Sequence, residues 1–320
     1  MIDLLSHIPD LFLKKRGIEK NIMHLISLEK QQELLLALAA DNLSLEFAAG
    51  GSGANSMIGI AQLGGRAAFS GKIGKDEHGK IYREKLEELG VSARLGEGEG
   101  TTGSSLVLVS KDGGRTMNTY LGMCQELQAT DIDPAVIQTS KYLYLTGYLW
   151  DTESQKKAVR CALDEAKKCN TKVAISLSDP FCVTRHKVDF KNLLQNYASM
   201  VFCNQEEAFT LLDTNVTQEA VEILSNWTET VVLTLGANGA LISHLGQTFY
   251  IDPLAVRVED TTGAGDAFAA GFLYGMTHDL SALDSGRIGA TLAGAVIEQT
   301  GSRYQGQAHT LIREKLGISL

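Results

Sequence analysis

The chain has 320 residues, 44% of them hydrophobic and 21% charged, a composition typical of a globular protein with one large domain and a smaller appendage. Its net charge of −9 and its lack of long Lys or Arg runs argue against nucleic-acid binding, so we expect small-molecule partners and a monomer or homodimer. The five cysteines lack metal-site spacing, no apolar stretch reaches membrane-spanning length, and the first residues lack a secretory pattern, which predicts a cytoplasmic protein without membrane contact.

From about residue 54 onward, patterns typical of helices alternate with patterns typical of strands. Helical apolar spacing at 54–64 is followed by a strand-like segment at 66–73 and an amphipathic helix at 76–90, which Gly90 is suited to end. Further on, the sequence predicts strands at 141–146, 172–177, 199–203 and 230–235, and helices at 154–168 and 205–212. This alternation predicts an α/β fold with a mostly parallel central sheet and helices on both faces.

Two segments, at about 4–46 and 101–122, interrupt the alternation. The second contains two strand-like stretches around Asp112, Gly113 and Gly114, a pattern that indicates a β-hairpin. Ligands of open α/β sheets bind beyond the carboxyl ends of the parallel strands. We therefore expect a small β lid, formed by these two discontinuous segments, to cover the site.

The most informative motif is Asp-Thr-Thr-Gly-Ala-Gly-Asp at 260–266, which leads into a run of small and apolar residues. Its small residues leave backbone amides exposed at an expected helix N-terminus, which favours a bound anion. Asp266 falls in the first helical turn, where a carboxylate can take a proton from a substrate hydroxyl while the amides stabilise a transferring phosphoryl group. The motif indicates a small-molecule kinase, although the same residues would also form an ordinary capped helix start.

Two other glycine-rich segments resemble nucleotide motifs only in part. Residues 74–81 miss the P-loop pattern because Ile81 stands where a hydroxyl must hold Mg²⁺, and residues 50–55 lack the third glycine of a dinucleotide fingerprint. In the second segment, Gly51, Ser52 and Asn55 lie where a turn leads into a helix. They are suited to hold sugar hydroxyls, or simply to form a tight loop with a cap.

Taken together, residues 50–79 and 258–273 resemble the two signatures of the ribokinase-like superfamily, in its phosphofructokinase-B group and adenosine kinase branch. The resemblance covers nearly the whole chain. It implies a single kinase domain over residues 1–320 with a ribokinase-like three-layer fold, a central sheet flanked by helices, and a small β lid.

The resemblance also implies roles for individual residues. It makes Asp266 the catalytic base, and it assigns the anion hole to the amides of Gly263, Ala264 and Gly265. Arg115 is expected to meet the phosphate from the lid, where its permanently charged fork suits an anion. The residues implied to hold the sugar are Asp3, Gly51, Ser52 and Asn55.

On the nucleotide side, the resemblance implies that Asn204 and Glu207, in an N-x-x-E motif, organise ATP and Mg²⁺, with Glu207 acting on the metal through water. Asn204 could equally cap the following helix. Thr234 and Gly236 match the nucleotide-binding strand end, and Gly239 lies in the turn after it. The sequence leaves undecided whether a monovalent cation such as K⁺ is a further cofactor.

The start of the chain departs from this family. Its members usually have an apolar strand that ends in Gly-Asn before the substrate Asp, whereas Asp3 here follows only two residues. Either the recorded start is too late or the fold closes the gap in another way. If the strand is missing, we expect a gap or groove beside the strand that contains residues 70–73.

The expected function is ATP-dependent phosphorylation of a primary hydroxyl on a ribonucleoside, with adenosine as the leading candidate. Tyr148, with the adjacent Leu149 and Trp150, would supply an apolar wall for a base, or belong to the core. The alternative is a kinase of a free sugar such as ribose or fructose. A third hypothesis is a non-catalytic nucleoside or sugar sensor on the same fold.

Overall fold

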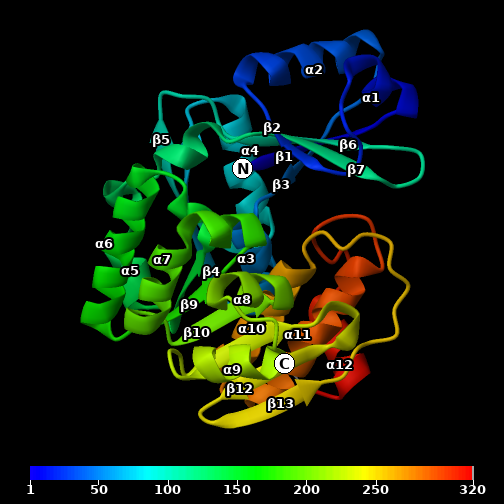
Figure 1. Ribbon diagram of the computed structural model, residues 1–320. Coiled ribbons are helices and arrows are strands. Elements are labelled where there is room, and N and C mark those ends of the chain that lie inside the picture. The colour runs from blue at the N-terminus through cyan, green and yellow to red at the C-terminus, as the bar shows by residue number, and fades with distance from the viewer. Residues whose placement is uncertain (319–320) are drawn as a thin grey trace.

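The protein, described by a computed structural model over residues 1–318, consists of an α/β body with a five-stranded sheet above it (Figure 1). The amino terminus lies between these two parts. The architecture confirms the predicted α/β class with a central sheet flanked by helices. No helix within residues 1–318 combines the length and apolar character needed to cross a membrane.

The body is organised around a six-stranded sheet with the order β13-β12-β11-β10-β9-β8. Strands β8 to β11 are parallel, and β12 and β13 extend the sheet in antiparallel fashion. All four strands predicted between residues 141 and 235 belong to it. Its strands are β8 (Tyr142–Thr146), β9 (Lys172–Ser176), β10 (Met200–Asn204), β11 (Thr230–Thr234), β12 (Ala240–His244) and β13 (Gln247–Ile251).

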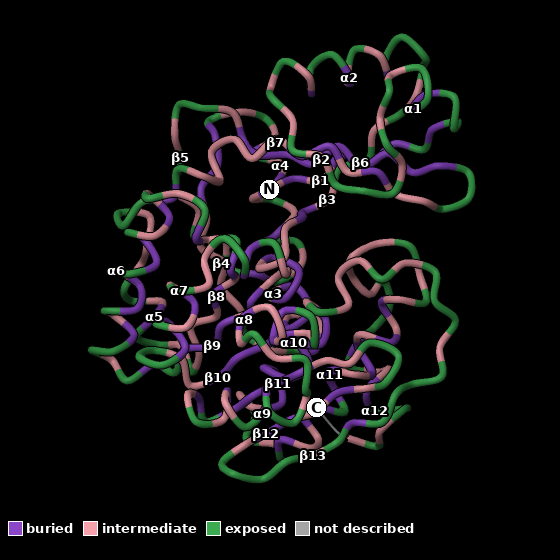
Figure 2. The backbone as a smooth tube through the Cα atoms, viewed as in Figure 1, coloured by how far each residue is buried: buried purple, intermediate pink, exposed green. Residues whose placement is uncertain are grey.

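Helices cover both faces of this sheet, and strand β10 shows why. Val201 and Cys203 pack into one hydrophobic cluster, while Met200 and Phe202 pack into a second cluster on the opposite face. Strands buried on both faces are typical of parallel sheets. Figure 2 shows these strands buried beneath helices whose outer surfaces are exposed. The first face carries α5 (Pro134–Gln138), α6 (Glu153–Cys169), α7 (Pro180–Asn196), α8 (Gln205–Leu212) and α9 (Thr217–Ser225), and the second α3 (Ser52–Gln62), α10 (Ala264–Thr277), α11 (Ala282–Ile297) and α12 (Ala308–Leu316).

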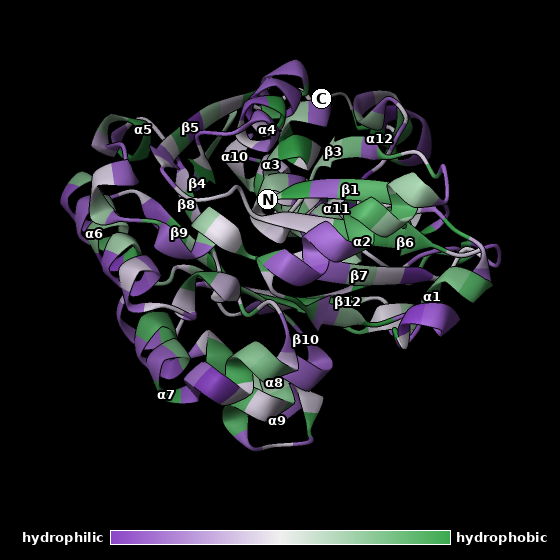
Figure 3. Cartoon of the chain, turned by 90° about the horizontal axis from the view of Figure 1, so that it is seen from above, coloured by the Kyte–Doolittle hydropathy of each residue, from purple (hydrophilic) through white to green (hydrophobic). Residues whose placement is uncertain are grey.

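The five-stranded sheet is built from two segments that lie far apart in the chain, with the order β2-β7-β6-β1-β3. The antiparallel pair β6 and β7 confirms the predicted hairpin. Helices α1 (Asp10–Arg16) and α2 (Leu28–Ala40) lie over the outer face of this sheet, away from the body (Figures 1 and 3). The strands are β1 (Ile2–His7), β2 (Met23–Leu25), β3 (Glu46–Ala49), β6 (Ser104–Val109) and β7 (Arg115–Tyr120).

Strands β4 (Ala67–Gly74) and β5 (Val91–Gly98) form a separate, two-stranded parallel sheet. Between them lies α4 (Glu77–Glu88), which Asp76 caps and which ends just before Gly90, with its φ of 81°. Within residues 1–318, strand β4 pairs only with β5, and β8 pairs only with β9. The predicted gap beside the strand that contains residues 70–73 is therefore confirmed.

Candidate active site

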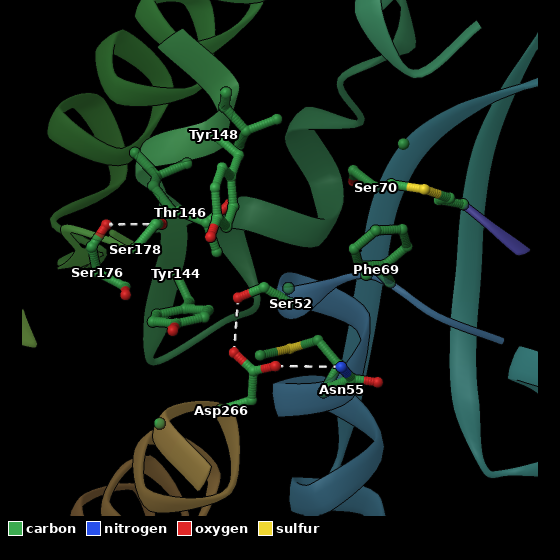
Figure 4. Close-up of a pocket in the computed structure, with 18 of the residues that line it drawn as sticks. Ser52, Asn55, Phe69, Ser70, Tyr144, Thr146, Tyr148, Ser176, Ser178 and Asp266 are labelled. Atoms are coloured by element: carbon green, nitrogen blue, oxygen red, sulfur yellow. Dashed lines mark hydrogen bonds between the residues drawn. The ribbon is translucent and has the colours of Figure 1, made fainter. Parts of the chain in front are cut away.

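A cavity of about 1640 Å³ lies between the five-stranded sheet and the body. The ends of β8, β10 and β11 open into it, as expected for a ligand site at the carboxyl edge of a parallel sheet. Figure 4 shows residues of α3, β4, β8 and α10 around this space. The predicted site residues that line it are Asp3, Gly51, Ser52, Asn55, Arg115, Tyr148, Asn204, Glu207, Thr234, Gly236, Gly263, Ala264, Gly265 and Asp266.

Asp266 lies in the first turn of α10 and is hydrogen-bonded on both carboxylate oxygens. Ser52 Oγ donates to Oδ1 over 2.6 Å, and Asn55 Nδ2 donates to Oδ2 over 3.1 Å (Figure 4). Burial raises the pKa of Asp266 to about 6, although these two hydrogen bonds lower it. The carboxylate is thus ionised at neutral pH, held in one orientation, and basic enough to accept a proton from a hydroxyl.

The N-terminus of α10 is shaped by its glycines. Gly263 has a φ of 80°, and a Cβ there would lie 2.2 Å from the carbonyl oxygen of Ser302, so only glycine fits. A Cβ on Gly265 would meet no atom within 4 Å, which leaves space for a ligand. The amide of Ala264 donates to Thr261 O over 3.2 Å, whereas within residues 1–318 the amides of Gly263 and Gly265 make no such bond. Of the three predicted anion-binding amides, the one on Ala264 is therefore engaged within the protein.

Arg115 on β7 reaches the same site from above. Its Nε lies 3.1 Å from Asp260 Oδ2, and the two side chains are only 13% and 12% exposed. Asp260 also accepts hydrogen bonds from the amides of Thr262, at 2.9 Å, and Gly301, at 3.0 Å. Asp260 had no predicted role of its own, because the sequence motif does not reveal a partner more than a hundred residues away. The ion pair joins the five-stranded sheet to the loop that leads into α10.

Asp3 lies on β1, against the turn that precedes α3. The turn comes so close that a Cβ on Gly50 would overlap the Asp3 carboxylate. Burial raises the pKa of Asp3 to about 6, while the chain's amino group and the positive charges of Arg303 and Arg115 lower it. Arg303 is a further charged residue near the site that sequence reasoning missed, since nothing in its local pattern distinguishes it from a surface arginine.

The side of the five-stranded sheet that faces the cavity carries apolar side chains beside the polar ones of Asp3, Ser105, Arg115 and Thr119. Met23, Leu25, Val107 and Met117 line the cavity from this sheet, and Phe69 of β4 lines it from the body. Opposite them, Tyr148 and Leu149 also line it, whereas Trp150 is buried in the core. The segment 148–150 thus belongs partly to the site and partly to the core. Burial, followed by the charge of Asp179, raises the pKa of Tyr148, so its hydroxyl stays protonated.

Asn204 ends β10 and caps α8. Its Oδ1 accepts from the amide of Glu207 over 2.8 Å, and the Glu207 carboxylate accepts from the Asn204 amide, at 3.1 Å, and from Nδ2, at 2.7 Å. Burial raises the pKa of Glu207 to about 7. The predicted roles of Asn204 as a helix cap and as a residue of the nucleotide site are therefore compatible, because Asn204 caps α8 and also lines the cavity.

The metal-binding capacity of this region is limited. Within residues 1–318, no group of three or more His, Cys, Asp or Glu side chains is arranged to hold a metal ion. Mg²⁺ usually keeps several waters and binds through few carboxylates together with substrate phosphates. Glu207, whose carboxylate is already hydrogen-bonded, fits an indirect contact of this kind.

The residues beyond β11 that were predicted to bind the nucleotide do not all lie at the cavity. Thr234 and Gly236 line the cavity, whereas Gly239 is not among the lining residues. Gly239 has a φ of 80°, and a Cβ there would lie 2.0 Å from the carbonyl oxygen of Ile251. Its own carbonyl accepts from the amide of Leu235 over 2.8 Å. The structure gives Gly239 a place in the tight turn to β12 instead of contact with the site.

Comparison with known proteins agrees with this geometry. The family described as pfkB family carbohydrate kinase matches residues 21–308. A probable sugar kinase from Rhizobium etli is 34% identical with a TM-score of 0.86, over 98% of this chain and 95% of that one. The adenosine kinase from Sinorhizobium meliloti is 35% identical with a TM-score of 0.85, over 98% and 96%. Adenosine kinase 2 of Arabidopsis thaliana is 24% identical over 327 residues, 95% of this chain and 93% of that protein.

The matched segment contains Asp266 and nearly all of the cavity-lining residues described above. It also spans both signatures on which the resemblance was based, so the resemblance is confirmed. The relatives are named as sugar, ribose or adenosine kinases, all of which phosphorylate an alcohol group. The chain therefore belongs to the pfkB family of carbohydrate kinases and is a phosphotransferase with an alcohol group as acceptor.

Proposed function

We propose that this kinase uses ATP to phosphorylate a primary hydroxyl of a ribonucleoside, with adenosine as the preferred acceptor. The observation that carries the proposal is the position of Asp266. Its carboxylate is buried, is oriented by Ser52 and Asn55, and lies in the first turn of a helix with unpartnered amides. A base beside an anion site is the arrangement that phosphoryl transfer to a hydroxyl requires.

In the proposed reaction, Asp266 accepts the proton of the acceptor hydroxyl as the hydroxyl oxygen bonds to the terminal phosphorus of ATP. The bond between that phosphorus and the bridging oxygen breaks, and ADP leaves. The amides at the start of α10 and the guanidinium of Arg115 stabilise the negative charge on the transferred group. Mg²⁺, when bound, neutralises phosphate charge, and Asn204 and Glu207 would hold it through water. We infer that the five-stranded sheet acts as the lid of this single kinase domain.

The preference for a nucleoside rests on the apolar side of the cavity. Met23, Leu25 and Met117 of the five-stranded sheet, with Phe69 and Tyr148, offer apolar and aromatic surface to a purine. A free sugar would leave this surface in contact with water, at a cost in hydrophobic free energy. The similarity to the S. meliloti adenosine kinase supports the same choice.

A free-sugar kinase is the second candidate. The R. etli protein, a probable sugar kinase, is as similar to this chain as the adenosine kinase is. Asp3, Ser52 and Asn55 supply hydroxyl-binding groups that would serve a free sugar as well as a ribose ring.

A panel of acceptors tests the proposal. The panel contains adenosine, other ribonucleosides, ribose and fructose, with ATP and Mg²⁺, and phosphorylated product is measured in K⁺ and in Na⁺ buffers. We expect the highest kcat/KM for adenosine and no product from 5′-deoxyadenosine, which lacks the acceptor hydroxyl. A higher kcat/KM for ribose or fructose would overturn the nucleoside assignment. Absence of product with every acceptor would favour a sensor.

A further inference from the structure

The chain crosses between the five-stranded sheet and the body at three places, and Thr102 lies at one of them. Within residues 1–318, these crossings follow β3, precede β6 and follow β7. Thr102 stands two residues before β6, is completely buried, and is not among the residues that line the cavity. Any effect of Thr102 on the reaction must therefore act through other residues.

Three hydrogen bonds hold Thr102 to the body. Its hydroxyl donates to Asp76 Oδ1 over 2.6 Å and accepts from the amide of Gly74 over 2.8 Å. Its amide donates to Asp76 Oδ2 over 2.8 Å. Asp76 Oδ1 also accepts from the amide of Gly79, over 2.8 Å, and so caps α4. Thr102 is thus fixed both to the end of β4 and to the start of α4.

The Asp76 carboxylate is well suited to this contact. Burial raises its pKa, but the hydrogen bonds from Thr102 and Gly79 outweigh that effect, so the pKa lies below the ordinary value. The carboxylate is therefore ionised at neutral pH, and hydrogen bonds to an ionised acceptor are about twice as strong as those between neutral groups. The backbones also approach closely, since a Cβ on Gly74 would overlap the carbonyl oxygen of Gly100.

The crossing that follows β7 is attached to the same place. The amide of Met123 donates to the carbonyl of Thr101 over 2.9 Å. A Cβ on Gly103 would overlap the carbonyl oxygen of Leu121, so the two segments lie in direct contact. Two of the three crossings are therefore held where Thr102 meets Asp76.

From Thr102 the connection to the acceptor side of the site is short. The carbonyl of Gly103 accepts a hydrogen bond of 3.0 Å from the amide of Ile2. Asp3 is paired with Ser105 in the parallel register of β1 and β6. Asp3 thus lies at the end of β1 nearest to Thr102, and a shift of the start of β6 relative to the body would move Asp3 with it.

We propose that Thr102 is a positioning residue for phosphoryl transfer, because its bonds to Asp76 and Gly74 set where Asp3 lies over the acceptor. The inference rests on the proposed function in one respect, since it takes Asp3 as a residue that binds the acceptor hydroxyls. It holds for a nucleoside and for a free sugar.

Substitutions at Thr102 test this role through the Michaelis constants. Thr102→Val keeps the shape of the side chain but removes both hydroxyl bonds, whereas Thr102→Ser keeps the hydroxyl. We expect Thr102→Val to raise KM for the best acceptor of the panel at least about tenfold, since small displacements of binding groups are costly. KM for ATP, whose proposed ligands belong to the body, should change by less than about twofold. Thr102→Ser should stay close to the parent in both constants.

Thr228→Val is the matched control. Thr228 is 6% exposed, its hydroxyl donates to the carbonyl of Thr230 over 3.1 Å, and it is not among the cavity-lining residues. This variant should lower Tm as Thr102→Val does but leave both Michaelis constants at the parental values. Equal KM for the acceptor in the two valine variants would overturn the proposal, as would an increase in Thr102→Ser as large as that in Thr102→Val.

Hydrogen exchange keeps the test separate from the proposed function. If no acceptor of the panel is phosphorylated, the proposed function fails, but Thr102→Val should still speed amide exchange in 2–5 and 103–106 at least about tenfold relative to Thr228→Val. Equal exchange of these two segments in the two variants would overturn the positioning role by itself.

Discussion

Arg115 and Asp260 form a largely buried ion pair, with 3.1 Å between Nε and Oδ2, that joins β7 to the loop before α10. Asp260 is further fixed by the amides of Thr262 and Gly301. If Arg115 meets a phosphate during the reaction, its contact with Asp260 must be exchanged for, or shared with, that phosphate. The pair therefore couples the position of the five-stranded sheet to the anion site.

We predict that this pair is energetically coupled. In a double-mutant cycle with Arg115→Gln and Asp260→Asn, the coupling free energy should be about 1 to 3 kcal/mol, because each single substitution leaves a buried charge without its partner. Urea unfolding of the four proteins measures it. The exposed pair Arg257 and Glu259, also 3.0 Å apart, is the control and should show much weaker coupling. Equal coupling in the two pairs would contradict the assignment of Arg115 and Asp260 as a structural link.

The second prediction concerns the pH dependence of activity. The hydrogen bond from Ser52 Oγ favours the ionised form of Asp266, so Ser52→Ala should raise the pKa of Asp266 above its value of about 6. A base must be deprotonated to work, so kcat falls as the pH drops through this pKa, and the variant should lose activity at a higher pH than the parent. The pH profile of kcat measures the shift.

Ser56→Ala is the matched control for this experiment. Ser56 Oγ lies on the same helix but donates to the carbonyl of Ser52, over 3.3 Å, and not to Asp266. In the Ser56→Ala variant, kcat should fall at low pH over the same range as in the parent. A Ser52→Ala profile identical to the parental one would show that the groups controlling kcat do not include Asp266.

A third prediction links Asp266 to stability. Its folded pKa of about 6 lies above the ordinary value of 3.8, so the folded state binds the proton more tightly than the unfolded chain. The contribution of this group to stability is complete below pH 4 and is lost as the pH rises through 6. The unfolding free energy of Asp266→Asn, relative to the parent, should therefore increase by up to about 3 kcal/mol between pH 4 and pH 8. Denaturant unfolding at both pH values measures this change, and a constant difference would contradict it.

The fourth prediction separates fold from function at Gly265. A Cβ at this position meets nothing within 4 Å, so Gly265→Val should fold normally and keep the parental Tm. Its side chain would crowd the space beside the α10 amides, where losing one donor costs about 3 to 4 kcal/mol of transition-state stabilisation in other enzymes. Gly265→Ala should give an intermediate kcat. Parental kcat in the valine variant would show that no phosphoryl group lies against this turn.

Local patterns in the sequence were sufficient to predict the parallel strands and the motifs around Asp266. Val201, Phe202 and Cys203 illustrate why, since a continuous apolar run is the signature of a strand buried on both faces. Contacts between distant segments were beyond this reasoning. The Asp260 to Arg115 pair has no local signal in the sequence, because it depends on how the chain folds back.

Gly239 is instructive in the same way. A glycine after a strand can serve a ligand or a turn, and only its φ of 80° and its distance to Ile251 distinguish the two roles. In the five-stranded sheet, the local structure could be predicted but its relation to the site could not. Its hairpin could be predicted from Asp112, Gly113 and Gly114, but the apolar surface that it turns toward the site could not.

The most direct test of the central claim is the rate of phosphate transfer from ATP to adenosine by Asp266→Asn. The substitution keeps the size of the side chain and one hydrogen-bond acceptor but removes the base. We expect kcat to fall by about 10² to 10⁴ while KM for adenosine changes little. The surface variant Asp213→Asn, at a position with a φ of 59° that asparagine tolerates, should keep the parental kcat. If Asp266→Asn retained the parental kcat on the best acceptor, Asp266 would not be the catalytic base and the proposed mechanism would be wrong.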